Sequence, residues 1–149
     1  MKANRNEPAA MRAALYLRVS SDGQVDGTSL DTQEAGCRAY CAEQGHRIVM
    51  VETEAASGGS LERPGLDRIR AAIAKGDVDL LVVLDLDRLS RSQNHLGVLF
   101  CEIEETHGAR VESVTQDLNG QAGLVIRTLA GLLAEMEREK IRKLSLIHI

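Results

Sequence analysis

The sequence predicts an α/β domain built on a mostly parallel sheet with flanking helices, and two observations support this. First, one pattern recurs at Gly45, Gly76 and Gly108: a helical stretch ends at a glycine, and a short polar segment and a strand-like stretch follow it. Second, the stretch at 80–84 (LLVVL) is apolar throughout, which is typical of a strand covered on both faces. Strands that alternate with helices of this length form βαβ units, and these build a parallel sheet.

Each element is expected where length and composition suit it. The first strand, at 13–19, is short, apolar and rich in strand formers, which indicates an interior position. Pro64 suits the first turn of a helix, because its fixed φ is already helical. The expected elements are strands at 13–19, 47–53, 80–84 and 111–115, helices at 30–44, 64–75 and 93–107, and a charged loop at 85–92.

The pattern of the C-terminal residues predicts one long helix, from Gly123 to Lys143, with an apolar stripe and a highly charged end. Both a packed terminal helix and a dimerisation helix are consistent with this pattern. Residues 1–12 are polar and patternless, and we expect a mobile tail. The last six residues (LSLIHI, 144–149) break the charged pattern without a cap and resemble a translated sequencing adaptor, so we expect a cloning or sequencing artefact.

Composition limits the functions that this chain can have. Its net charge of −4 argues against holding nucleic acid by bulk electrostatics, and one Phe, two Tyr and no Trp argue against a stacking platform for single strands. No stretch approaches the ~18 apolar residues of a membrane span. The three cysteines and four histidines lack metal-ligand spacing, so we expect reduced core thiols in a cytosolic protein and no metal site.

Polar side chains collect in three loops that follow strands, and these loops meet at one edge of a parallel sheet. Arginine forks match the oxygens of a phosphodiester and stabilise the extra charge of its transition state. A serine beside them is a candidate nucleophile. Arg88 and Arg91 are three residues apart and are expected on one side of a helical turn. The residues concerned are Arg18 and Ser20 in the first loop, Ser57 and Arg63 in the second, and Asp87, Arg88 and Arg91 in the third.

Five blocks of the sequence resemble the motifs of serine recombinases, the family of resolvases, invertases, large serine integrases and transposases. They keep the family's order from about residue 13 to 143. The longer stretch between Ser20 and Ser29 is similar to the large integrase and transposase branch. The blocks are YLRVSS (16–21), SLDTQ (29–33), SG (57–58) with RPGL (63–66), LDRLSR (86–91) and AEMERE (134–139).

The resemblance implies a site-specific DNA recombinase in which Ser20 attacks the scissile phosphate. The products of this step would be a 5′-phosphoserine link and a free 3′ hydroxyl, followed by strand exchange and religation. Arg18, Arg88 and Arg91 would bind the phosphate and favour the transition state. Asp87 would position an arginine or help protonate the leaving oxygen. No metal or other cofactor is implied, because the covalent link conserves the bond energy.

The resemblance also implies supporting residues and partners. Gln33, Ser57 and Arg63 would support the site or bind DNA phosphates. The catalytic domain would occupy 13–120, and the helix at 121–143 would form a homodimer that assembles into a tetramer on double-stranded DNA. The family's DNA-binding domain is expected to be absent, which would explain the acidic charge and leave a weakly binding, weakly active or inactive chain. A bacterial or phage origin is implied.

Two other interpretations stay open from the residues. A flavodoxin-like module that holds a phosphorylated ligand on Arg18, Arg88 and Arg91 would not need Ser20. A regulator that only dimerises through the helix at 123–143 would form no covalent link to DNA.

Overall fold

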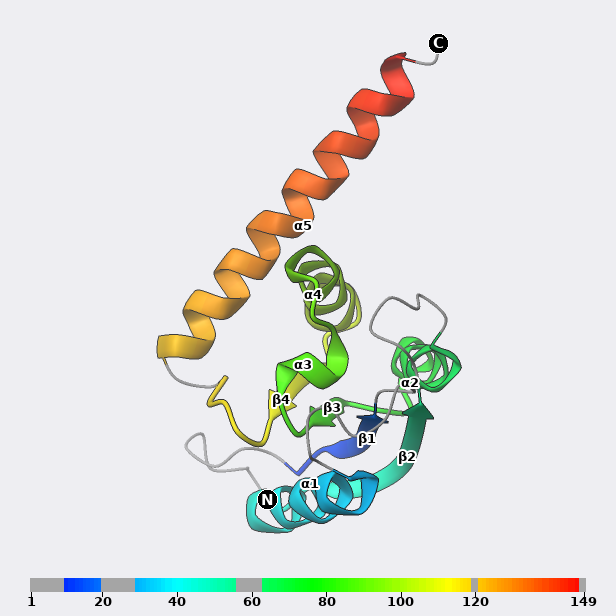
Figure 1. The fold of residues 1–149 in the computed structure, drawn as a ribbon, viewed down its shortest axis with the longest axis vertical. Coiled ribbons are helices and arrows are strands. Elements are labelled where there is room, and N and C mark those ends of the chain that lie inside the picture. Colours follow the sequence, from blue (N-terminus) through cyan, green and yellow to red (C-terminus); the bar gives the residue numbers. More distant parts are fainter. Residues whose placement is uncertain (1–9, 20–28, 56–62, 119–120, 148–149) are drawn as a thin grey trace, which may run out of the picture.

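The structure is a computed structural model that describes residues 10–19, 29–55, 63–118 and 121–147. Its four strands form one parallel sheet in the order β2-β1-β3-β4 (Figure 1). The predicted fold class is therefore confirmed. The strands are β1 (Arg12–Val19), β2 (Arg47–Ala55), β3 (Leu80–Val83) and β4 (Arg110–Ser113).

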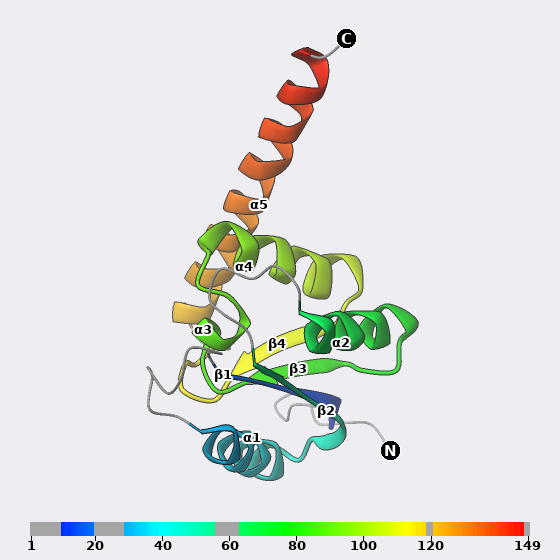
Figure 2. The same cartoon turned by 45° about the vertical axis from the view of Figure 1, so that its right-hand side comes forward.

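Helices cover both faces of the sheet (Figure 2). Helix α1 (Leu30–Gln44) lies on one face, and α2 (Pro64–Lys75) and α4 (Gln93–Phe100) lie on the other. Ser29 begins α1, because its side chain accepts a hydrogen bond from the Thr32 N–H. Gly45 ends the helix with a φ of 77°, a left-handed conformation that favours glycine.

Two elements differ from the prediction. The loop expected at 85–92 contains a short helix, α3 (Leu86–Leu89). The helix expected at 93–107 is α4 followed by a π-helix, η1 (Cys101–Thr106). Within η1, Ile103 is fully buried in the core, while Glu102 pairs with Arg70 of α2 at 2.6 Å. The wider turn of the π-helix thus places Ile103 in the core and Glu102 beside α2. Regular α-helical spacing in the sequence does not predict this turn.

Alternate residues of β1 pack against different layers. Leu15 and Leu17 face α1, where Cys37 and Cys41 are fully buried beside them. Burial raises the pKa of Cys37 to about 12 and that of Cys41 to about 11, so both remain thiols at neutral pH. Cys101 is only partly buried, so the expectation of three core thiols holds for two of them.

The last residues of the expected tail belong to the fold. The Met11 N–H donates to His46 Nδ1 at 3.2 Å, and Arg12 begins β1 and pairs with Asp79 at 2.9 Å. The rest of the expected tail, residues 1–9, lies outside the described residues.

Helix α5 (Gln121–Ile147) has 27 residues and is longer than the predicted 123–143. Its first half packs against α4, and its second half extends away from the sheet and its helices (Figures 1 and 2). Within the described part of the chain, no helix combines the length and the apolar character needed to cross a membrane.

Arg127 attaches the first turns of α5 to the edge of the sheet. Its guanidinium donates twice to the Glu104 carboxylate, from Nε at 2.7 Å and from Nη2 at 3.0 Å. Nη2 also donates to the Val111 carbonyl at 3.1 Å, and Glu104 accepts from the Val111 N–H at 3.0 Å. Because β4 is an edge strand, this ion pair occupies backbone groups that another strand would otherwise use.

We predict that Arg127→Met lowers the free energy of unfolding by about 2 kcal/mol, because it leaves partly buried charged and backbone groups without partners. Urea unfolding measures this, and amide exchange at Val111 should become faster. Arg142→Met is the matched control: its exposed pairs with Glu135 and Glu139 should contribute less than about 0.5 kcal/mol. Equal effects of the two substitutions would contradict the attachment role of Arg127.

Candidate active site

The site begins at Arg18, near the carboxyl end of β1. β1 pairs with β3 only as far as Leu15, but it pairs with β2 as far as Val19, so its end projects past β3. The buried side-chain amide of Gln33 holds both backbone groups of Arg18: the Arg18 N–H donates to Oε1 at 3.1 Å, and Nε2 donates to the Arg18 carbonyl at 2.9 Å. Helix α1 thereby fixes the backbone two residues before Ser20, which lies outside the described residues.

Helix α3 follows the neighbouring strand β3, and its residues contact the end of β1. Arg18 Nη2 donates to the Asp87 carbonyl at 2.6 Å, and Arg88 Nη1 donates to the Arg18 carbonyl at 3.2 Å. Asp87 therefore meets Arg18 through its backbone, and its own side chain is exposed. Arg88 is 6% exposed, and its Nε lies 3.6 Å from Asp85 Oδ2.

Arg63 approaches from the start of α2. It is 6% exposed, and its Nη1 donates to the Leu89 carbonyl at the end of α3. Buried Glu54, near the end of β2, fixes the start of α2 because it accepts from the Gly65 N–H at 2.8 Å. Glu54 also accepts from the Tyr16 hydroxyl. Burial and this hydrogen bond raise the pKa of Tyr16, so it remains a donor.

The guanidiniums are close enough to repel one another. The pKa of Arg18 is lowered, first by burial and then by the positive charge of Arg63; Tyr16 opposes this shift, and Arg91 and Arg88 add smaller lowering effects. Among the described residues, the Arg18 guanidinium meets the Asp87 carbonyl and the charges of other guanidiniums rather than a carboxylate. A buried excess of positive charge is costly unless an anion neutralises it, and guanidinium forks suit phosphate.

The structure brings most of the predicted site residues together. Arg18, Gln33, Asp87 and Arg88 are joined by hydrogen bonds, and Arg63 is linked to the end of α3. One geometric expectation is wrong. Arg88 and Arg91 do not share a helical turn, because α3 ends at Leu89 and Ser90 is extended, with φ −168° and ψ 147°.

Two predicted residues cannot be placed, and sequence analysis missed others. Ser20 and Ser57 lie outside the described residues. Glu54 was not identified from the sequence. The only signal for it was its position, as an acid at the end of a strand and three residues before Ser57. Within the described ranges, no group of three or more His, Cys, Asp or Glu is arranged to hold a metal ion.

Comparison with known proteins decides the family. The model of the family described as "Resolvase, N terminal domain" matches residues 13–146. The chain belongs to this family. This resolvase-family chain is 36% identical to the DNA-invertase of Escherichia phage P1 over 129 residues, which are 85% of the chain and 62% of that protein. It is 38% identical to the serine recombinase gin of Escherichia phage Mu over 128 residues, 85% of the chain and 60% of that protein.

Solved structures agree with this assignment. The resolvase-family chain superimposes on the N-terminal catalytic domain of TP901-1 integrase with a TM-score of 0.71 and 29% identity, over 86% of this chain and 97% of that one. The relatives thus include invertases as well as an integrase domain. The chain spans about three fifths of the length of the phage P1 and phage Mu proteins named above.

His95, at the border of the site, should make stability depend on pH. Burial and then the charges of Arg63 and Arg70 lower its pKa below 6.5, against a smaller opposite effect of Glu102. The unfolded chain therefore binds this proton more readily, so the free energy of unfolding falls as the pH drops below about 6.5. Urea unfolding between about pH 5 and 7.5 should show a shallower dependence for His95→Gln.

The control for this prediction is Asn94→Gln, because Asn94 is an exposed neighbour of His95 that does not titrate. It should leave the pH dependence of unfolding close to that of the wild type. An unchanged dependence in His95→Gln would show that His95 titrates alike in the folded and unfolded states.

Proposed function

We propose that this chain is the catalytic part of a site-specific DNA recombinase, with Ser20 as the nucleophile. The observation that supports this best is the cluster of Arg18, Arg63, Arg88 and Arg91 at the end of β1. The chain continues from that end through Val19 directly to Ser20. The proposed substrate is double-stranded DNA, and the phage P1 relative is itself named a DNA-invertase.

The proposed step exchanges one phosphodiester for another. The Ser20 oxygen bonds to phosphorus and loses its proton, while the bond from phosphorus to the 3′ oxygen breaks and that oxygen gains a proton. The extra negative charge of the pentacoordinate transition state develops among the arginines, of which Arg18, Arg63 and Arg88 are already oriented by backbone oxygens. The 5′-phosphoserine link keeps the bond energy, so a 3′ hydroxyl can reverse the step and join strands without an external energy source.

The remaining predicted residues have proposed supporting roles. Gln33 holds the backbone of Arg18, two residues before Ser20 in the sequence. The Asp87 carbonyl orients Arg18, and its exposed carboxylate is available to the leaving oxygen. Arg63 and Ser57 would contact phosphate oxygens from the second loop.

We predict a covalent adduct between wild-type protein and nicked DNA duplexes whose sequence is randomised around the nick. In such a substrate, the fragment that carries the released 3′ hydroxyl is short and diffuses away after cleavage. Religation is then prevented, so the phosphoserine link accumulates. Denaturing gels detect the adduct, and peptide mass spectrometry should place it on Ser20. Ser20→Ala should form none, and Arg88→Gln should form it about a hundredfold more slowly, because one transition-state donor is lost.

Arg47→Gln is the matched control, because Arg47 is exposed at the opposite end of the sheet. It should form the adduct at the wild-type rate. Adduct formation by Ser20→Ala, or no adduct from the wild type at saturating DNA, where weak binding no longer limits the reaction, would contradict the proposal. If the wild type forms no adduct, tight binding of a small phosphorylated ligand would favour the flavodoxin-like alternative.

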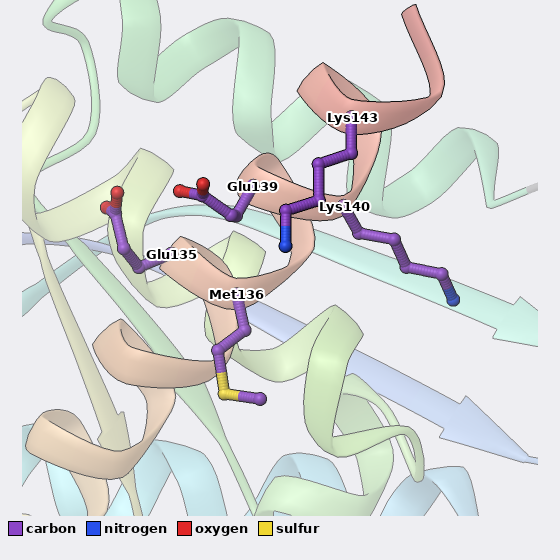
Figure 3. A pocket seen from close by; sticks show the side chains of 5 residues that line it. All are labelled: Glu135, Met136, Glu139, Lys140 and Lys143. Atoms are coloured by element: carbon purple, nitrogen blue, oxygen red, sulfur yellow. The ribbon is translucent and has the colours of Figure 1, made fainter. Parts of the chain in front are cut away.

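We further propose that α5 pairs with α5 of a second copy and that two such dimers form a tetramer during synapsis. Leu129, Leu132 and Met136 are 54%, 58% and 60% exposed, although they follow the spacing of one helix face. Figure 3 shows Met136 projecting from α5, with acidic and basic side chains of the same helix around it. An apolar stripe framed by charges is typical of helices that pair.

Sedimentation equilibrium should find a dimer of the wild type. Met136→Lys should shift it to the monomer, because a charge would then lie in the apolar contact. Ile141→Lys is the control: Ile141 is 59% exposed, but at 100° per residue it lies on the other side of α5. A wild-type monomer, or equal effects of the two substitutions, would contradict pairing through this stripe.

A further inference from the structure

Helix α3 is too short to fix its own position. It contains only Leu86–Leu89, yet it carries both Asp87 and Arg88. Asp85 precedes the helix, where an acid commonly caps the first turn, but its side chain makes no capping hydrogen bond. The orientation of α3 therefore depends on contacts from elsewhere in the chain.

Gln116, in the segment between β4 and α5, supplies the missing contact. Its Oε1 accepts from the Leu86 N–H, the first amide of α3, at 3.0 Å. The same oxygen accepts from Ser113 Oγ at 3.2 Å, which holds the side chain in place. Thr115 ties this segment to the end of β3, because its N–H and Oγ1 both donate to the Leu84 carbonyl, at 3.0 and 3.1 Å.

We propose that Gln116 is a positioning residue for the arginine site; this inference rests on the proposed function. By accepting from Leu86, it leaves the Asp85 carboxylate directed toward Arg88, with Oδ2 3.6 Å from Nε. Asp85 Oδ1 is buried and has no hydrogen-bond partner among the described residues. It is therefore a spare acceptor, on the residue next to Leu86, for the Leu86 amide when Gln116 is lost.

Loss of the Gln116 oxygen leaves the Leu86 N–H unsatisfied in a residue that is 7% exposed, which is unfavourable. If the Asp85 carboxylate rotated toward the Leu86 amide, the carboxylate would lose its contact with Arg88. That movement would disturb both the Arg88 contact to the Arg18 carbonyl and the Arg18 contact to the Asp87 carbonyl. Gln116 thus acts on the arginines through α3 and needs no contact with substrate.

Gln116 also connects the site to α5. Ile126 and Leu129 of α5 line a groove together with Leu86, Asp87 and Gln116. A shift of the first turns of α5 would therefore reach α3 through the same side chain.

The test uses three variants. Gln116→Met keeps the size of the side chain and removes the acceptor, Gln116→Glu keeps an acceptor, and Gln44→Met is the control at the end of α1. Adduct formation on the randomised nicked duplexes gives the rate at saturating DNA and the DNA concentration for half saturation. Amide exchange measures the Leu86 N–H, and the Nε–H NMR signal reports on Arg88.

Gln116→Met should slow adduct formation at saturating DNA by about tenfold, with little change in half saturation, because geometry rather than binding is impaired. The Leu86 amide should exchange faster, and the Arg88 signal should shift. Gln116→Glu should stay within about threefold of the wild-type rate, because it retains the acceptor. Gln44→Met should match the wild type in every measurement.

A wild-type rate in Gln116→Met, or a Gln116→Glu variant as slow as Gln116→Met, would overturn the proposal. Failure of the proposed function is separately visible, because the wild type would then form no adduct. The Leu86 exchange and the Arg88 signal still decide the positioning role in that case. If both are unchanged in a folded Gln116→Met protein, Gln116 does not position α3.

Discussion

The repulsion among buried guanidiniums at the end of β1 is the constraint on which the rest of the site depends. Arg18 loses hydration and faces the charges of Arg63, Arg88 and Arg91, which together lower its pKa. Backbone oxygens of Asp87 and Leu89 hold two of these side chains without neutralising them. The cluster is thus stabilised by dipoles that leave the net positive charge available to a phosphodiester.

The topology explains why distant segments meet at this point. In the order β2-β1-β3-β4, the chain first moves outward from β1 to β2 and then crosses back to β3. The crevice between β1 and β3 is therefore the switch point at which α/β sheets usually bind ligands. Arg18 leaves β1 there, α3 follows β3, and α2 brings Arg63 from the end of β2.

Sequence reasoning predicted the fold class and most of the arginine cluster, because the succession of strands, helices and loops along the chain follows from local patterns. It did not find Glu54 or Gln116, because the contacts that give them their roles are distant in sequence: Gly65 lies 11 positions from Glu54, and Leu86 lies 30 positions from Gln116. The expected pairing of Arg88 and Arg91 on one turn failed because α3 ends at Leu89. Local periodicity does not report where a four-residue helix stops.

The most direct measurement of the central claim is an NMR titration of the arginine Nε–H signals with a phosphodiester dinucleotide. If the guanidiniums form one anion site, the signals of Arg18, Arg63, Arg88 and Arg91 should shift together along one binding curve, while Arg47 stays unchanged. A response confined to exposed Arg91, or separate curves for the buried arginines, would contradict a shared phosphate site.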